Sequence, residues 1–263
     1  MVVANCRRQR GLSLVELMVA MVLGLLITAA VIQLFLTNRQ TFNLQQGIAS
    51  VQEQGRFAVD FLSREIMGAG YGSVSAAIKV NAVGSEKASR DGVPFDSLHV
   101  LFDNNGVYFD GAQSRPRGPR DCSGGALNRT NAGAITPAET FKRYYVTVEA
   151  GGNGVLMCED SDGSNVVLLD NVDVFQVLYG VATRNGNETR YRYMTATELD
   201  RADDVVSVRF AVLVSSDGVA VSEKNQANAV EIFGVSYAGQ VDFHDGKLRR
   251  LFVSSVALRN VAG

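Results

Sequence analysis

The sequence has few of the residues on which catalytic and metal sites most often depend. Only two of its 263 residues are histidines, His99 and His244, and neither lies in a recognisable motif. Neither a nucleophile elbow nor a pair of zinc ligands occurs. We therefore expect a protein that is not an enzyme, with no catalytic residue, metal or cofactor, and with both histidines structural or solvated.

Proline is also scarce, and the first of the four prolines is Pro94. No residue before it therefore breaks a helix by lacking a backbone N–H. Apolar residues recur at spacings of three and four, and polar residues fill the sides between them. We predict one long helix from about residue 12 to residue 67. The later part of its apolar stripe consists of Leu44, Ile48, Val51, Gly55, Val59, Leu62 and Ile66.

Charged residues are absent from Leu17 to Asn38. As a helix this stretch is long enough to cross a hydrocarbon core of about 30 Å. Arg7, Arg8 and Arg10 lie before residue 12, where there is no acid, and such arginines stay in the cytoplasm, which places the chain after residue 40 on the far side. The rest of the chain is acidic, which disfavours a general nucleic-acid binder.

One carboxylate, Glu16, lies at the start of this apolar stretch. A secretory signal would have a shorter apolar run and a small-residue cleavage site, for which Thr28-Ala29-Ala30 is a poor candidate. A plain membrane anchor explains the length and the arginines. Neither explains Glu16, because a carboxylate near lipid is unfavourable without a positive partner. Cleavage before Leu12 would create an α-amino group about one helical turn away, on the same face.

Residues 10–17, RGLSLVEL, resemble the class III signal of type IV prepilins, which has a glycine before the cut and a glutamate at mature position five. The resemblance implies cleavage between Gly11 and Leu12 by a prepilin peptidase, and N-methylation of Leu12. It also implies that the apolar segment is kept as the assembly stem, with Glu16 as the charge-pairing residue. Leu12 departs from the usual phenylalanine.

After the predicted helix, which we expect to end in the glycines at 68–72, the pattern changes to the alternation typical of strands. Most links are too short for crossover helices, so the sheet should be antiparallel. The predicted strands are Ser97–Phe102, Arg143–Val148, Val155–Cys158, Val166–Leu169, Val172–Tyr179, Val205–Val214, Glu231–Tyr237 and Leu251–Leu258.

Segments 170–180, DNVDVFQVLYG, and 248–260, LRRLFVSSVALRN, resemble parts of the PilW family of minor pilins. The resemblance implies an α+β, type IV pilin-like fold in which a long N-terminal helix packs on an antiparallel β-sheet domain. It implies a structural subunit that helps prime pilus assembly and enters the fibre near its tip. The implied partners are other minor pilins, the major pilin, the prepilin peptidase and the inner-membrane assembly platform.

We expect four parts in the chain. Residues 1–11 are a basic leader that is removed, and 12–38 are the transmembrane and assembly half of the stem helix. Residues 39–72 are its periplasmic half, and 73–263 are a β-rich periplasmic domain. The protein should first span the inner membrane once, with its N-terminus cytoplasmic, and later lie in the extracellular pilus.

Three cysteines are present, and removal of the leader would remove Cys6. Cys122 and Cys158 then remain as a pair in an oxidising compartment, and we expect a disulfide between them, two unpaired thiols being the alternative. Such a bond would stabilise the fold by about 4 kcal/mol in the chain-entropy model.

Three loops were considered as binding sites. The basic loop Arg115–Arg120 has no interleaved aromatic residue, so we expect it to be solvated and expect no direct nucleic-acid contact. The acidic turn at 159–165 lacks the distal bidentate glutamate of a calcium hand, and the loop at 181–190 lacks alternating carboxylates. We expect no metal at 181–190, and at 159–165 we expect a solvated turn, with calcium binding there as the open alternative.

Two other functions stay open. A pseudopilin of type II secretion would share the signal and the stem. A membrane-anchored or secreted periplasmic binding protein or enzyme is the alternative of another class. A mature N-terminus near Val31 would indicate secretion, whereas one at Leu12 would indicate a pilin.

Overall fold

The computed structural model describes residues 13–70, 78–79, 89–90, 93–94, 96–102, 108–109, 116–117, 120–124, 140–148, 154–161, 163–186, 188–199, 205–218, 230–237, 241 and 245–260. The chain separates into two compact units, Met1–Gln46 and Gly47–Gly263.

The predicted long helix is present as α1 (Leu14–Gly68). Ser13 caps its start, since the Ser13 Oγ accepts a hydrogen bond from the backbone N–H of Glu16 at 3.2 Å. At the other end Gly70 adopts a left-handed backbone with φ of 76°, and its N–H donates to the carbonyl of Leu101 at 2.8 Å. A glycine after the last turn therefore ends the helix, as the sequence predicts.

The buried stripe of α1 is rotated from the predicted one. Val51, Gly55, Leu62 and Ile66 are buried as expected, but Gly47 and Ala58 join them in place of Leu44, Ile48 and Val59. Leu44 and Ile48 are 37% and 38% exposed. The physical reason is close approach: a Cβ built on Gly55 would lie 2.0 Å from the ring of Phe252, so small residues must face the strands here.

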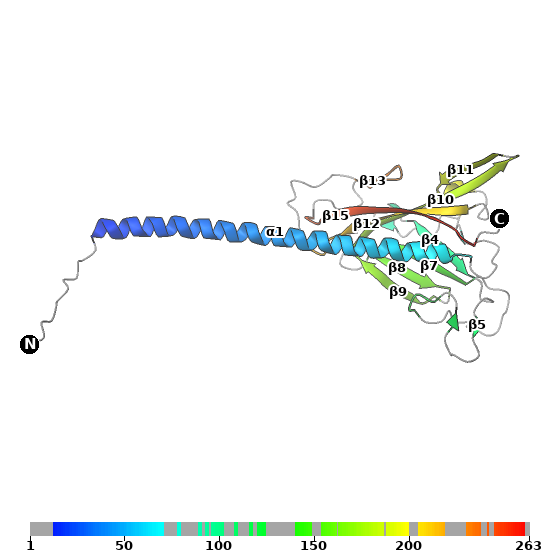
Figure 1. The fold of residues 1–263 in the computed structure, drawn as a ribbon, viewed down its shortest axis with the longest axis horizontal. Helices are drawn as coiled ribbons and strands as arrows, with labels where there is room; N and C mark the ends of the chain where they lie inside the picture. The colour runs from blue at the N-terminus through cyan, green and yellow to red at the C-terminus, as the bar shows by residue number, and fades with distance from the viewer. Residues whose placement is uncertain are drawn as a thin grey trace, which may run out of the picture. The chain divides into compact units, whose positions relative to one another are not determined.

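Among the described residues the strands form two larger antiparallel sheets (Figure 1). The five-stranded sheet has the order β1-β4-β7-β8-β9, with β1 (Ile78–Lys79), β4 (Ser97–Phe102), β7 (Thr140–Val148), β8 (Gly154–Asp160) and β9 (Asn165–Asp170). The four-stranded sheet has the order β11-β10-β12-β15, with β11 (Glu188–Met194), β10 (Val172–Asn185), β12 (Val205–Ser215) and β15 (Arg249–Ala257).

Short elements complete the described fold. They are the pairs β2 (Ser89–Arg90) with β3 (Val93–Pro94), β5 (Tyr108–Phe109) with β6 (Pro116–Arg117) and β13 (Glu231–Ile232) with β14 (Val235–Ser236), and the 3-10 helix η2 (Ala196–Glu198).

β10 joins the two sheets. Its Phe175 carbonyl accepts from the backbone N–H of Asp96, and its Val177 N–H donates to the Asp96 carboxylate at 2.8 Å. Asp96 directly precedes β4, so one residue links the start of β4 in one sheet to β10 in the other. The core between the sheets and the second half of α1 includes Leu62, Ile66, Tyr144, Phe175 and Phe210, all fully buried.

Two predictions in the carboxyl-terminal half were wrong. The predicted strand Glu231–Tyr237 is a tight hairpin, because Phe233 and Gly234 both have positive φ, 51° and 84°, as a two-residue turn between paired strands requires. The segment at 181–190, interpreted as a loop, is instead the end of β10, a turn with Gly186 at φ 64°, and the start of β11.

Candidate functional site

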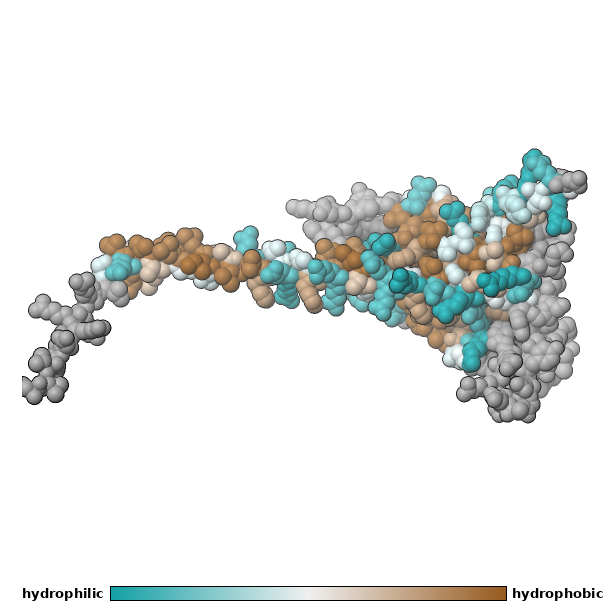
Figure 2. Space-filling model, viewed as in Figure 1, coloured by the Kyte–Doolittle hydropathy of each residue, from teal (hydrophilic) through white to brown (hydrophobic). Residues whose placement is uncertain are grey.

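The first part of α1 exposes a nearly unbroken apolar surface. Its large apolar side chains between Leu14 and Leu36 are all about half exposed or more. By length and composition α1 contains a stretch that could cross a membrane, and none of that stretch is buried in the protein (Figure 2). Exposure of so large an apolar surface to water is unfavourable, so lipid or other apolar helices must cover it.

Glu16 lies exposed in the first turn of this surface. A carboxylate there is favoured by the positive end of the helix dipole, and its backbone N–H is capped by Ser13. Ala20 and Gly24 follow at intervals of four residues, close to the same face. A Cβ built on Gly24 would meet nothing within 4 Å, so none of the residues that the structure describes requires a glycine at this position.

The polar side chain of Thr28 is satisfied within the helix, since its hydroxyl donates to the carbonyl of Gly24 at 2.8 Å. Glu16 therefore stands out as the group in this stretch that needs a partner from elsewhere. The predicted processing residues, Gly11 and Leu12, lie outside the described residues. Sequence reasoning missed Ser13 as the helix cap, although the spacing Ser-x-x-Glu from Ser13 to Glu16 is the usual capping-box signal.

A buried ion pair fastens the second half of α1 to β7. The Glu65 carboxylate accepts from the Lys142 Nζ at 2.7 Å and from the Tyr144 hydroxyl at 2.8 Å. The Lys142 side chain is only 3% exposed. Burial, followed by the negative charge of Glu65, raises the pKa of Tyr144 well above its ordinary value. Sequence reasoning missed this contact because its partners lie far apart in the chain.

Cys122 and Cys158 form a disulfide, the pair that the sequence analysis expects. The backbone N–H of Cys122 also donates to the Asp160 carboxylate, at 2.9 Å to Oδ2. Asp160, with Ser164 bonded to the same oxygen, belongs to the acidic turn considered above for calcium. Its carboxylate is thus engaged in holding the segment around Cys122 against β8.

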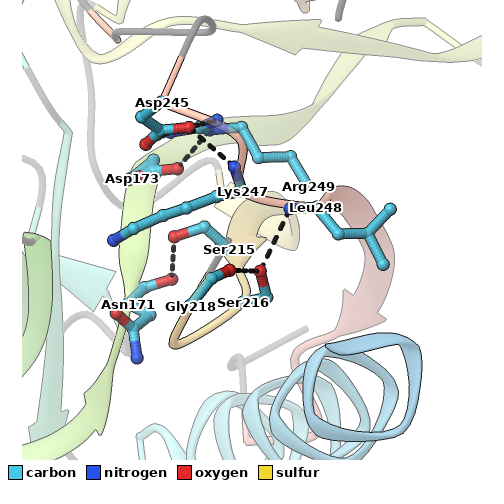
Figure 3. Close-up of polar contacts among 9 residues, drawn as sticks. All are labelled: Asn171, Asp173, Ser215, Ser216, Gly218, Asp245, Lys247, Leu248 and Arg249. Carbon is cyan, nitrogen blue, oxygen red and sulfur yellow. Dashed lines mark hydrogen bonds and ion pairs between the residues drawn. The ribbon is translucent and has the colours of Figure 1, made fainter. Parts of the chain in front are cut away.

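A second cluster of charges fixes the start of β15 (Figure 3). Arg249 donates to Asp173 on β10 at 2.7 Å and, through both terminal nitrogens, to Asp245 at 2.7 and 2.6 Å. Burial alone raises the pKa of Asp245, but hydrogen bonds from Arg249 and from the Lys247 backbone outweigh it and hold that pKa below its ordinary value. Burial alone would lower the pKa of Arg249, but its hydrogen bonds and charge interactions with Asp245 and Asp173 outweigh burial and raise that pKa.

Hydrogen bonds beside this cluster tie three strands together. The Asn171 carbonyl accepts from the backbone and hydroxyl of Ser215, at 2.8 and 3.3 Å. The Ser216 hydroxyl accepts from the Leu248 N–H at 3.0 Å and donates to the Gly218 carbonyl at 2.8 Å. In Figure 3 these bonds link the ends of β10, β12 and β15. The cluster is therefore a structural fastening.

The other predicted residues lie apart from these groups. His99 is buried on β4, where its ring stacks on Phe141 with 5.4 Å between centroids. His244 lies outside the described residues. At the end of the basic loop, Arg120 is exposed and donates to the Gly124 carbonyl at 2.7 Å.

Comparison with known proteins gives two family matches. Residues 6–32 match the model of the prokaryotic N-terminal methylation motif, and residues 143–260 match the model of the type IV pilus-assembly protein W. A type IV-like pilin from Thermus thermophilus is similar in structure at 15% identity and a TM-score of 0.37, over 82% of this chain and 98% of that one. None of the curated proteins compared with the chain matches it.

The N-terminal match, together with the exposed apolar helix and the antiparallel sheets, defines a type IV pilin-like protein. The two family matches, at residues 6–32 and 143–260, support a type IV pilus minor pilin of the PilW family. The family comprises structural pilins, which are anchored in the membrane by the N-terminal helix and assemble with other pilins.

Proposed function

We propose that this minor pilin helps to prime pilus assembly and is incorporated into the fibre near its tip. The observation that carries the proposal is the exposed apolar surface of α1, which has one carboxylate, Glu16, in its first turn. This surface directly follows a prepilin-type leader. A subunit whose largest apolar surface is left uncovered is suited to packing against copies of similar helices.

The mechanism begins at residues 1–11, which the prepilin peptidase removes by cutting between Gly11 and Leu12. N-methylation of Leu12 follows. Residues 12–38 hold the protein in the inner membrane, while 39–72 and 73–263 lie in the periplasm.

During extraction from the membrane, the carboxylate of Glu16 pairs with the N-terminal amine of a neighbouring pilin and sets the register of the two helices. Small residues along the same helix, Ala20, Gly24, Ala29 and Ala30, allow the neighbour to approach closely. Other minor pilins, the major pilin and the inner-membrane assembly platform are the partners of this step.

Replacement of Glu16 tests the mechanism. The variant Glu16→Ala should still be cleaved and should keep its fold, because the side chain is exposed on the helix surface, yet pili per cell should fall several-fold. Fibres are counted by electron microscopy, and cleavage is measured by the mass of the mature N-terminus. Glu53→Ala, which removes an exposed glutamate from the same helix beyond the apolar segment, is the matched control and should leave fibre number unchanged.

Normal fibre numbers in Glu16→Ala would contradict charge pairing. A mature protein that keeps its first eleven residues would contradict processing. If deletion of the gene blocked protein secretion and left pili intact, the chain would be a pseudopilin of type II secretion instead.

A further inference from the structure

The hairpin of β10 and β11 extends beyond the rest of its sheet. β12 pairs with β10 only as far as Val181, whereas β11 pairs with it through Asn185 (Figure 1). We call residues 179–194 the β10–β11 ribbon. All side chains from Glu188 to Tyr193 are exposed, and Figure 2 shows this end of the sheet as hydrophilic.

One face of the ribbon carries two tyrosines. Tyr191 lies opposite Ala182 and Tyr193 opposite Gly180, and opposite residues of an antiparallel pair point to the same side. Tyr191 is 74% exposed and Tyr193 is 42% exposed. The Tyr193 ring lies close to Gly180, since a Cβ built on that glycine would be 3.2 Å from its Cε1, whereas most of the Tyr191 side chain is uncovered. This tyrosine face is a shallow aromatic platform.

Arginines border the tyrosine face. Arg184 is exposed on it, and the Arg209 guanidinium of β12 lies 5.7 Å from the centre of the Tyr193 ring. The one carboxylate of the ribbon, Glu188, lies on the opposite face, where it pairs with Arg190 at 3.2 Å. The ribbon is therefore basic on a protein that is acidic beyond its leader, and its tyrosine face has no acid of its own.

This combination fits an extended polyanion with flat aromatic groups. Residues two apart on a strand are about 6.7 Å apart, so Tyr191 and Tyr193 can each stack on one base of an unpaired strand. Arginines beside such rings meet the phosphates. A duplex fits less well because its bases are stacked inside and cannot reach the tyrosine rings. An acidic protein fits less well because it would use the arginines and leave the rings unused.

We propose that the β10–β11 ribbon binds single-stranded nucleic acid, with bases on Tyr191 and Tyr193 and phosphates at Arg184 and Arg209. From the sequence we expected no direct nucleic-acid contact, because the basic loop at 115–120 has no interleaved aromatic residue. The ribbon has both arginines and aromatic rings. Their placement on one face follows from the pairing of β11 with β10, which the sequence did not predict. The proposal does not depend on the role of the chain in assembly.

Fluorescence anisotropy with a labelled oligothymidylate tests the proposal, using the full chain in neutral detergent. We expect binding that weakens as salt is raised. Tyr191→Ala should weaken it about five- to hundredfold, whereas Tyr191→Phe, which keeps the ring, should bind nearly as well as the parent chain. Arg184→Gln should lower the slope of log affinity against log salt by about one.

The matched control is Arg56→Gln, which removes an exposed arginine from α1 outside the ribbon and should not change the affinity. Unchanged thermal unfolding of Tyr191→Ala shows that its effect is local. The proposal is overturned if the oligonucleotide does not bind, or if Tyr191→Ala binds like the parent. It is equally overturned if duplex DNA, polyphosphate, polyglutamate or an acidic polysaccharide binds as tightly as oligothymidylate.

Discussion

At the scale of single residues, two ion pairs of the described residues, Arg249 with Asp173 and Lys142 with Glu65, join elements that lie far apart in the chain. Arg249 and Asp173 are 76 residues apart and their side chains are 9% and 5% exposed. A buried charge left without its partner is costly, so each such pair strongly favours one arrangement of the strands. Exposed pairs such as Arg64 with Asp60 on α1 contribute much less.

The pKa of Asp245 gives a pH-dependent prediction. Because this pKa is lower in the folded protein than in the unfolded chain, the stabilisation is present above the ordinary aspartate value of about 4 and is lost as the pH falls through the folded value. Asp245→Asn should therefore lower the free energy of unfolding at neutral pH and flatten its fall in acid. Urea unfolding from about pH 7 to pH 3 measures both effects.

Asp60→Asn is the control, since it removes one partner of an exposed pair and should leave the acid slope close to that of the parent. An unchanged slope in Asp245→Asn would show that other carboxylates dominate the acid sensitivity of the fold.

At the scale of elements, the packing of α1 on β15 depends on one glycine. A side chain at Gly55 would overlap the Phe252 ring, whereas a side chain at Gly24 would meet nothing. Gly55→Val should therefore destabilise the fold by about 1–3 kcal/mol or more, because an overpacked contact forces the helix or the ring to shift.

Chemical unfolding of the detergent-solubilised chain measures the effect, with Gly24→Val as the control that leaves the free energy of unfolding unchanged. Adding Phe252→Ala to Gly55→Val should recover part of the loss. If the two variants proved equally stable, α1 would not approach β15 as closely as described.

Elements with strong periodicity could be predicted from the sequence, and elements set by tertiary contacts could not. The helix and most long strands follow from apolar spacing, so their bounds agree with α1, β4 and β12 to within a few residues. β11 was missed because nearly all its side chains are exposed, so its alternation of tyrosine and arginine gives no buried apolar face of the kind by which strands are recognised. The rotation of the buried stripe was missed because Gly47 and Ala58 are small and add little to an apolar periodicity, although both are buried.

The candidate site divides in the same way. Gly11, Leu12 and Glu16 belong to one short motif, so the resemblance to prepilin signals predicts them without any tertiary contact. The pairing of Glu65 with Lys142 joins residues 77 positions apart, and nothing in either neighbourhood indicates the other.

At the scale of the whole molecule, the disulfide closes a long connection. Cys122 and Cys158 are 36 residues apart, and the bond joins the segment at 120–124 to β8. Replacing both by serine should lower the free energy of unfolding by about 4 kcal/mol, since the unfolded chain regains the entropy of an open loop.

Unfolding with and without a reducing agent measures this contribution. The reductant should destabilise the parent chain by a similar amount and leave the double variant unaffected. A parent chain whose stability does not respond to reduction would contradict the expected role of the bond.

The last strand has a consequence for how the chain matures. The Asn260 side chain donates to the Ala69 carbonyl at 3.0 Å, across 191 positions of sequence, and Phe252 fills the space over Gly55. A ribosome must therefore synthesise almost the whole polypeptide before Phe252 can cover Gly55 and before Asn260 can bind the Ala69 carbonyl. Until then Gly55 and the end of α1 lack these two partners, so a chain truncated before β15 differs from a finished subunit at this part of the helix.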